Sequence, residues 1–184
     1  MDNESNKNNK IKTFIGIGAF AVLIAIAVFA YDFLQTGENA PHETPQNPAP
    51  DFTILDAENN EVRLSDFFGK PIVLNFWTTW CPACVAELPV FENMYHEMGD
   101  EVHFLKVNLL DGTRETREDV DSFMAERNLT FSVYFDTTGE ASDAYGVRGI
   151  PMTFFIDAEG QLVAGIQGPA DEGALREGIE MAGR

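Results

Sequence analysis

Apolar and polar positions divide the chain into four stretches with different patterns. Residues 13–31 are apolar and carry no charged side chain, whereas residues 1–12 are mostly polar. Residues 32–50 contain four prolines and few large apolar side chains, so they cannot bury enough surface to fold alone. From residue 51 to residue 184, short apolar runs alternate with amphipathic stretches, which is typical of an α/β domain. The pattern therefore predicts an N-terminal segment, an apolar segment, a proline-rich linker and one folded domain.

Within the domain, the spacing of apolar residues predicts individual strands and helices. The run at residues 72–77 is almost entirely apolar, as expected of a strand buried on both faces of a sheet. A hairpin is expected from 52–55 to 62–64, with its turn near Asn59 and Asn60. Further strands are expected at 102–108, 132–135, 152–156 and 162–166, and helices from about residue 82 onward and at 116–127, 140–145 and 171–182.

The apolar segment at residues 13–31 is long enough to cross a membrane. At about 1.5 Å per residue, a helix of this length just spans a hydrocarbon core of about 30 Å. Three lysines precede it and acidic residues follow it, so the positive-inside rule predicts a cytoplasmic N-terminus and an extracytoplasmic domain. The alternative is a cleaved signal peptide with its cleavage site at residues 28–30, although the uncharged run is longer than the usual core of such peptides. We expect a single-pass anchor retained in the cell membrane.

The chain is strongly acidic, and its charge limits the partners that it can bind. Acidic residues outnumber basic ones 30 to 12, and residues 51–184 hold 25 of the acidic residues and nine of the basic ones. Nucleic acids are bound by clustered lysine and arginine, so they are not expected as partners. A solubilising surface explains this charge more simply than a specific basic partner does.

Cys81 and Cys84 are the only cysteines, so any internal disulfide joins them to each other. They follow the predicted buried strand and open the predicted helix. At a helix N-terminus, free backbone N–H groups and the helix dipole stabilise a thiolate and lower the pKa of the thiol. Cys81 is therefore the expected nucleophile, and Cys84, one turn into the helix, is expected to resolve mixed disulfides. Pro82 suits the first helical turn, where no hydrogen bond is lost.

A zinc half-site is the alternative explanation of the two cysteines, because C-x-x-C also occurs in zinc-binding proteins. A tetrahedral site would need two further ligands, and the histidines of the chain are His42, His96 and His103. One of them lies in the predicted linker. We therefore expect no metal, and no cofactor other than a redox-active disulfide between the two cysteines.

Two motifs, in the expected order, resemble the thioredoxin superfamily. The segment VLNFWTTWCPACVAELP at 73–89 is similar to the thioredoxin active-site segment, and YGVRGIP at 145–151 with MTFFID after it resembles the cis-proline loop and its following strand. Over residues 50–182 the similarity is greatest to the TlpA/ResA-like membrane-anchored oxidoreductases. The resemblance implies a thioredoxin-like α/β fold, in which helices flank a central mixed sheet, with an N-terminal hairpin and a central helix–strand insertion over about 116–135.

The resemblance also implies where a client protein binds. Pro151 is expected to be cis and to lie against the cysteine pair, where the backbone of Ile150 can pair with an incoming polypeptide. Trp80 resembles the surface tryptophan that shapes the docking site in this superfamily. We expect Pro82 and Ala83, between the two cysteines, to contact the client as well.

Glu87 is the expected acid–base residue. Cytoplasmic thioredoxins place a buried aspartate where this chain has Asn75, and that acid assists proton transfer to the resolving cysteine. Asn75 cannot titrate, whereas Glu87 lies three residues after Cys84 and can take over the function if partial burial tunes its pKa. The alternative is a solvated glutamate on the helix surface.

The resemblance implies a dithiol that reduces disulfides of client proteins outside the cytoplasm, commonly in apocytochrome c, and that is re-reduced by a membrane thiol carrier. Ala83 is neutral where strongly oxidising relatives carry histidine, which favours a reducing pair. A disulfide-forming oxidase remains an alternative. So does an exported thiol peroxidase of the peroxiredoxin type, although the chain has no P-x-x-x-T-x-x-C segment. An intact cysteine pair disfavours a redox-inert binding module.

Overall fold

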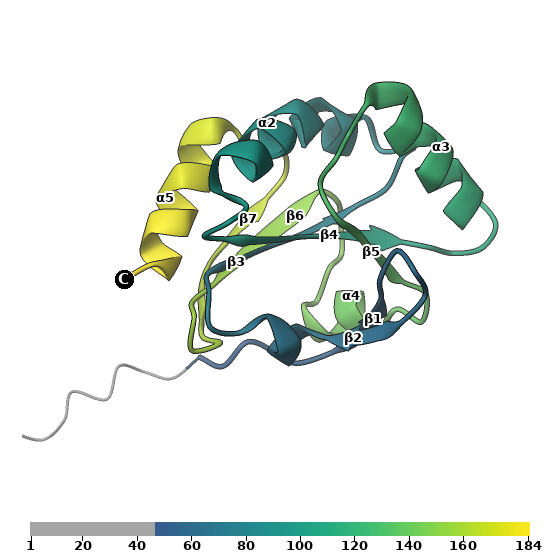
Figure 1. Cartoon of the computed structure of the whole chain (residues 1–184). Coiled ribbons are helices and arrows are strands. Elements are labelled where there is room, and N and C mark those ends of the chain that lie inside the picture. The colour runs from purple at the N-terminus through teal and green to yellow at the C-terminus, as the bar shows by residue number, and fades with distance from the viewer. Residues whose placement is uncertain (1–46) are drawn as a thin grey trace, which may run out of the picture. The chain divides into compact units, whose positions relative to one another are not determined.

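The computed structural model describes residues 47–184, which fold around one seven-stranded mixed sheet (Figure 1). The strands are β1 (Thr53–Leu55), β2 (Glu61–Arg63), β3 (Ile72–Trp77), β4 (His103–Leu109), β5 (Val133–Asp136), β6 (Met152–Ile156) and β7 (Leu162–Gln167). The helices are the 3₁₀ helix η1 (Leu64–Phe67) and the α-helices α2 (Pro82–Met98), α3 (Arg117–Arg127), α4 (Glu140–Ala144) and α5 (Glu172–Ala182). Each predicted strand and helix of the domain is confirmed to within two residues at its ends, whereas η1 was not predicted.

The order of strands in the sheet is β2-β1-β5-β4-β3-β6-β7. Strands β3, β4 and β5 are parallel, and β6, β7 and the hairpin β1–β2 add to them in antiparallel fashion. The turn of the hairpin lies where it was predicted, and Asn59 takes a positive φ of 66° there. The sheet is therefore mixed, as the thioredoxin-like fold requires, and the predicted helix–strand insertion is α3 with β5.

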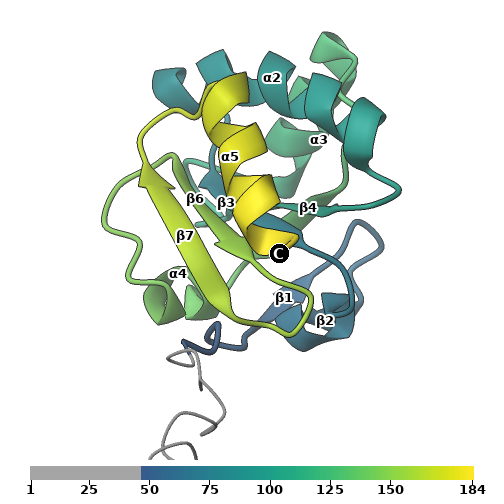
Figure 2. The ribbon, with the colours of Figure 1, turned by 90° about the vertical axis from the view of Figure 1, so that its left-hand side faces the viewer.

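Helices cover both faces of the sheet. Helices α2, α3 and α5 lie on one face, and α4 and η1 lie on the other (Figures 1 and 2). Because side chains alternate along a strand, β3 sends Ile72, Leu74 and Phe76 into the core beneath α4. It sends Val73 and Trp77 into the two clusters under α2, α3 and α5. All six residues of β3 are buried, so the strand is held from both sides.

The described part of the chain begins to pair with the sheet a few residues before the predicted domain boundary at 51. The amide of Ala49 donates to the carbonyl of Gly160 (2.9 Å), and the amide of Leu162 donates to the carbonyl of Asn47 (2.8 Å). Ala49 is buried in the same cluster as residues of β1 and β3. Residues 47–49 were assigned to the linker by their composition. They are instead hydrogen-bonded to the turn before β7 and to Leu162, the first residue of β7.

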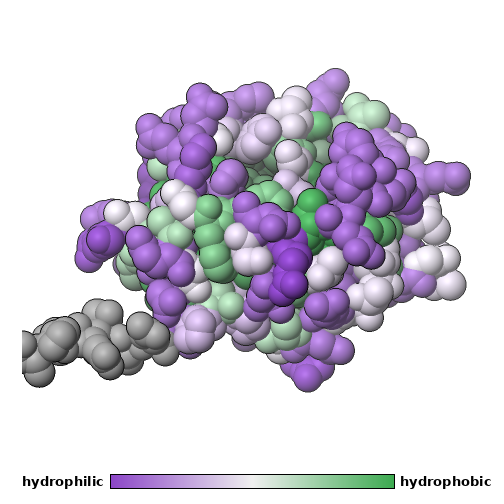
Figure 3. Space-filling view, turned by 60° about the horizontal axis from the view of Figure 1, so that its bottom comes forward, coloured by the Kyte–Doolittle hydropathy of each residue, from purple (hydrophilic) through white to green (hydrophobic). Residues whose placement is uncertain are grey.

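The surface is predominantly polar, as the net charge of the domain leads one to expect. Figure 3, on the side of α4 and η1, shows hydrophilic side chains over most of the surface, with smaller hydrophobic areas between them. None of the helices among residues 47–184 is both long and apolar enough to cross a membrane. The predicted anchor at 13–31 lies outside the described residues.

Candidate active site

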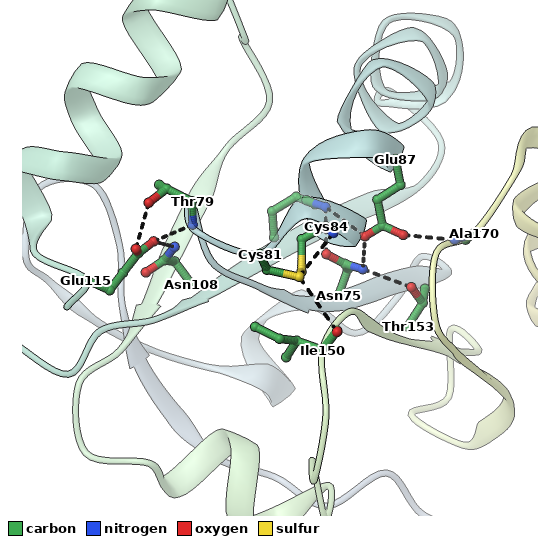
Figure 4. Close-up of a disulfide and its surroundings, with 11 residues drawn as sticks. Asn75, Thr79, Cys81, Cys84, Glu87, Asn108, Glu115, Ile150, Thr153 and Ala170 are labelled. Carbon is green, nitrogen blue, oxygen red and sulfur yellow. Dashed lines mark hydrogen bonds and ion pairs between the residues drawn. A yellow bond between two sulfur atoms is a disulfide. The ribbon is translucent and has the colours of Figure 1, made fainter.

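The two cysteines lie at the junction between β3 and α2. Cys81 is the N-cap residue of α2, and its sulfur accepts a hydrogen bond from the amide of Cys84 at 3.2 Å. Their Cα atoms are 5.2 Å apart and their side chains form a disulfide (Figure 4). Pro82 occupies the first helical position, where its missing N–H leaves no acceptor unpaired. In the reduced state, the same amide and the helix dipole are placed to stabilise a thiolate at Cys81.

The two sulfur atoms differ in their surroundings. Cys84 is completely buried, whereas Cys81 keeps 6% of its surface exposed. Cys84 packs with Leu88 beneath the start of α2, and Cys81 Sγ lies 3.7 Å from the carbonyl oxygen of Ile150. An attacking group from outside therefore reaches Cys81 first.

The cis-proline loop lies beside the disulfide, as the resemblance implied. The Ile150–Pro151 peptide bond is cis, and Pro151 is buried. A groove of about 300 Å³ runs from this loop to Trp80, and its walls include Ile150 and Val147. An extended client segment fits such a groove if it pairs with the backbone of Ile150.

The remaining residues predicted to contact the client lie near this groove. Trp80 is one of its walls and is 39% exposed, and the guanidinium of Arg114 lies 3.5 Å from the centre of the indole ring. Pro82 is exposed and Ala83 is half-buried at the start of α2, although neither lines the groove. Arg114 was not predicted, because nothing in its local pattern indicates that it stacks on Trp80.

Glu87 is not a surface residue. Only 2% of it is exposed, so the alternative of a solvated helix glutamate is wrong. Its Oε1 accepts a hydrogen bond from Asn75 Nδ2 (2.9 Å), and its Oε2 accepts one from the amide of Ala170 (2.9 Å). Asn75 Nδ2 also donates to Thr153 Oγ1 on β6 (2.9 Å), and the Nζ of Lys106 lies 3.8 Å from Glu87 Oε1. Figure 4 shows this carboxylate pointing from α2 toward β3 and the loop at Ala170.

These contacts have opposing effects on the pKa of Glu87. Burial raises the pKa, because a carboxylate loses its hydration inside the protein. The charge of Lys106 and the hydrogen bonds from Ala170 and Asn75 oppose this shift, and the net pKa is above its ordinary value. A carboxyl group of this kind titrates closer to neutral pH than a surface glutamate does, which suits it to exchange protons.

A second buried carboxylate, that of Glu115, holds the loop before Cys81. Glu115 Oε1 accepts hydrogen bonds from the amide of Thr79 (2.7 Å) and from Asn108 Nδ2 (2.6 Å), and Oε2 accepts one from Thr79 Oγ1 (2.7 Å) (Figure 4). A turn built by Asp111 directs Glu115 inward, because Asp111 Oδ1 accepts the amides of residues 113–115. These hydrogen bonds lower the pKa of Asp111 to about 2, and the bond from the Glu115 amide contributes most to this shift. No local pattern signals this buried carboxylate, since it precedes an ordinary helix start.

Comparisons with known proteins agree with this geometry. A sequence profile described as the AhpC/TSA family matches residues 45–164. The chain belongs to the AhpC/TSA family. It is 34% identical over 177 residues to "Thiol-disulfide oxidoreductase ResA" of Oceanobacillus iheyensis, covering 91% of this chain and 90% of that protein. The protein of the same name from Bacillus subtilis is 34% identical over 170 residues, covering 91% of this chain and 92% of that protein.

Comparison with solved structures leads to the same family of folds. StoA from Bacillus subtilis is 30% identical and matches with a TM-score of 0.61, over 73% of this chain and 98% of that one. The exposed lipoprotein thioredoxin Etrx1 from Streptococcus pneumoniae is 31% identical, with a TM-score of 0.63, over 71% of this chain and 98% of that one. The chain is thus a thioredoxin-like, ResA-like thiol–disulfide oxidoreductase, and Cys81 and Cys84 form its disulfide.

Replacing Glu115 with alanine should destabilise this ResA-like oxidoreductase. The half-buried Thr79 amide and the buried Asn108 side chain would lose their acceptor, which costs about 1–3 kcal/mol in the free energy of unfolding. Denaturant unfolding of the oxidised full-length chain measures this change. Glu126→Gln, an exposed change on α3, is the control and should lie within about 0.5 kcal/mol of wild type. Equal stability of the Glu115→Ala and control variants would contradict the anchoring role.

Proposed function

We propose that this chain reduces disulfide bonds of exported proteins, with Cys81 as the attacking thiol and Cys84 as the resolving one. The observation that supports this proposal most directly is the difference between the two sulfurs. Cys81 caps a helix N-terminus at the edge of a groove, while Cys84 is fully buried one turn below it. The relatives are named thiol–disulfide oxidoreductases, which is consistent with this chemistry.

The first step joins the client to Cys81. The Cys81 thiolate attacks one sulfur of the client disulfide, which forms a new S–S bond and releases the other client sulfur as a thiolate that takes a proton from solvent. The client segment lies in the groove between Trp80 and the loop at Ile150, where its backbone can pair with the Ile150 carbonyl. This pairing holds the client sulfur near Cys81.

The second step releases the client and needs a proton acceptor. The thiol of Cys84 gives its proton to the carboxylate of Glu87, one turn along α2, and the resulting thiolate attacks Cys81 Sγ. The Cys81–Cys84 disulfide forms, and the second client sulfur leaves and takes up the proton. Two electrons have then passed from the dithiol to the client, together with one proton from Cys84 and one from solvent. Glu87 suits this role because burial raises its pKa.

The direction of transfer is supported by the residues between the cysteines. Pro82 and Ala83 are both neutral, so the Cys81 thiolate gains no stabilisation from a charged neighbour there. Over-stabilisation of that thiolate is what makes a dithiol pair a strong oxidant. A reducing pair is therefore the better proposal than a disulfide-forming oxidase.

The location of this activity is proposed from the sequence alone. The apolar segment at 13–31, with lysines before it and acids after it, supports a retained anchor with the domain outside the cytoplasm. A reductant on that side of the membrane must be re-reduced by electrons from the inside, which favours a membrane-embedded thiol carrier as donor. Apocytochrome c remains the client class that the family resemblance implies.

A thiol peroxidase is the alternative within the same fold. Thr78 lies three residues before Cys81, as the P-x-x-x-T-x-x-C segment requires, but Leu74 stands where that segment has its proline. Leu74 is moreover near the centre of a buried strand and faces the core beneath α4. The peroxide-activating segment is therefore incomplete, and the proposal of disulfide exchange is preferred.

Replacing Cys84 with serine should trap clients on Cys81. Without the resolving thiol, the mixed disulfide cannot be released by the protein itself. Non-reducing gels of the full-length variant, mixed with a peptide that contains an oxidised C-x-x-C-H sequence, should show covalent adducts. Cys81→Ser is the matched control and should form few of them. If adducts form with the Cys81→Ser variant and not with the Cys84→Ser variant, the two roles are reversed.

Replacing Glu87 with glutamine should change the pH dependence of client release. Glutamine keeps the size and polarity of the side chain, but its amide nitrogen cannot accept the hydrogen bond that one carboxylate oxygen of Glu87 accepts, and it cannot take a proton. Release near pH 7 should therefore slow by about 100-fold, at the low end of general acid–base effects. The acid limb of the pH profile is the range in which the rate falls as a carboxyl group with a raised pKa becomes protonated, and it should also disappear in this variant. Stopped-flow measurement of release between about pH 5 and 9 tests this.

The matched control for this measurement is Glu101→Gln, which makes the same chemical change at an exposed site. Its profile should follow that of the wild-type chain. If the profile of the Glu87→Gln variant also superimposes on the wild-type profile, Glu87 takes no part in the proton transfer.

A further inference from the structure

Lys106 is a buried cation that takes no part in the steps proposed for the exchange reaction. It lies on β4 in the core, with no exposed surface. Its ammonium group lies 3.7 Å from the ring centre of Phe91 on α2, and the rings of Phe131 and Trp77 lie at 5.5 and 5.7 Å. Cation–π contacts of this kind stabilise an ammonium that has lost its water. They do not by themselves explain why the core contains a charge at all.

The ammonium is connected to Glu87 by a short chain of polar contacts. Lys106 Nζ donates to Asn75 Oδ1 at 2.6 Å, and Asn75 Nδ2 donates to Glu87 Oε1 at 2.9 Å. The direct distance from Lys106 Nζ to Glu87 Oε1 is 3.8 Å, and neither side chain is exposed. The chain of contacts crosses the core from β4 through β3 to α2. Asn75 cannot titrate, but its side chain thus links Glu87 to Lys106 through two hydrogen bonds.

Glu87 and Lys106 oppose the effect of burial on each other. Burial lowers the pKa of Lys106 to about 7, while the charge of Glu87 acts to raise it. Burial raises the pKa of Glu87, while the charge of Lys106 acts to lower it. Each group thus favours the charged form of the other.

We propose that Lys106 is a positioning residue that holds the Glu87 carboxylate ionised and oriented, through Asn75, so that Glu87 can accept the proton of Cys84. This inference rests on the proposed function of Glu87 and adds the group that keeps it in the reactive form. Without the cation, a carboxyl group buried at this depth would be protonated over more of the acid and neutral range. A protonated Glu87 has no capacity to accept a further proton.

Among the residues that the structure describes, the charge that shifts the pKa of each member of this pair is the charge of the other. On α2, the carboxylate of Glu92 lies on the far side of Phe131, where it accepts the amide of that residue. The elements packed against the pair contribute neutral groups: Asn75 and Trp77 on β3, Thr153 on β6, Phe131 before β5 and the amide of Ala170 before α5. Within residues 47–184, the ion pair formed by Lys106 is the one with Glu87. A change at Lys106 should therefore act on the pH profile through Glu87.

The test is Lys106→Met, which removes the cation and keeps an unbranched apolar side chain. The pKa of Glu87 should rise, because the carboxylate loses the opposite charge that favours it. The acid limb of client release by the full-length chain should therefore move by about 1–3 pH units to higher pH. The rates of variant and wild type should differ most below about pH 7, where Lys106 is protonated, and converge toward pH 9. An unshifted acid limb overturns the proposal.

Two further variants separate a positioning role from a structural one. Lys106→Arg keeps a cation and should keep the acid limb near its wild-type position. Lys106→Met in the Glu87→Gln background should add no further shift, because the group through which it acts is gone. A loss of rate that is equal at every pH would indicate a packing defect and would contradict the proposal.

The outcomes also distinguish this proposal from the function on which it rests. If Glu87→Gln alters the profile and Lys106→Met does not, Glu87 acts without Lys106. If Glu87→Gln leaves the profile unchanged, the proton-acceptor role itself fails.

A measurement on the wild-type protein applies even if the Lys106→Met variant does not fold. The carboxyl carbon of Glu87 in ¹³C-glutamate-labelled full-length chain is assigned by its absence in the Glu87→Gln variant. At pH 7 its resonance should be that of a carboxylate. A neutral carboxyl resonance at that pH would show that Lys106 does not keep Glu87 ionised.

Discussion

The junction between β3 and α2 is the constraint on which the site depends. Strand β3 is buried on both faces, so its end at Trp77 is fixed relative to the sheet. Glu115 then fastens Thr79, and α2 begins shortly afterwards with Cys81 as its cap. A cysteine held in this way has the helix N-terminus on one side and the cis-proline loop on the other. The position of the reactive sulfur follows from the packing of the strand before it.

The same packing places polar groups inside the core. Alternation along β3 directs Asn75 toward α2, between the apolar positions Val73 and Trp77. The side-chain hydrogen bonds of Asn75 all join it to side chains from other elements: Glu87, Thr153 and Lys106. Buried polar groups are tolerated when they are paired. Here the pairing joins β3 to α2, β4 and β6, and α2 is the helix that carries both cysteines, so the network can stabilise the fold and also influence the chemistry.

Local patterns in the sequence were sufficient to predict much of the fold, and distant contacts were not. Period-two and helical spacing, with the cysteine motif and the proline loop, predicted the strands, the helices and the place of Cys81, Cys84 and Pro151. The burial of Glu87 could not be predicted, because its helix position also suits a surface residue, and the loop at Ala170 that covers it lies 83 residues away. Lys106 and Glu115 were missed for the same reason: their partners come from other elements.

The reduction potential of the Cys81–Cys84 pair tests most directly whether this chain works as a reductant. Equilibration of the full-length chain with glutathione buffers of known potential gives the value. We expect a potential below about −200 mV, on a scale where thioredoxin lies at about −270 mV and the strong oxidant DsbA at about −120 mV. A potential close to about −120 mV would contradict a reducing role and would indicate a protein that forms disulfides in its clients.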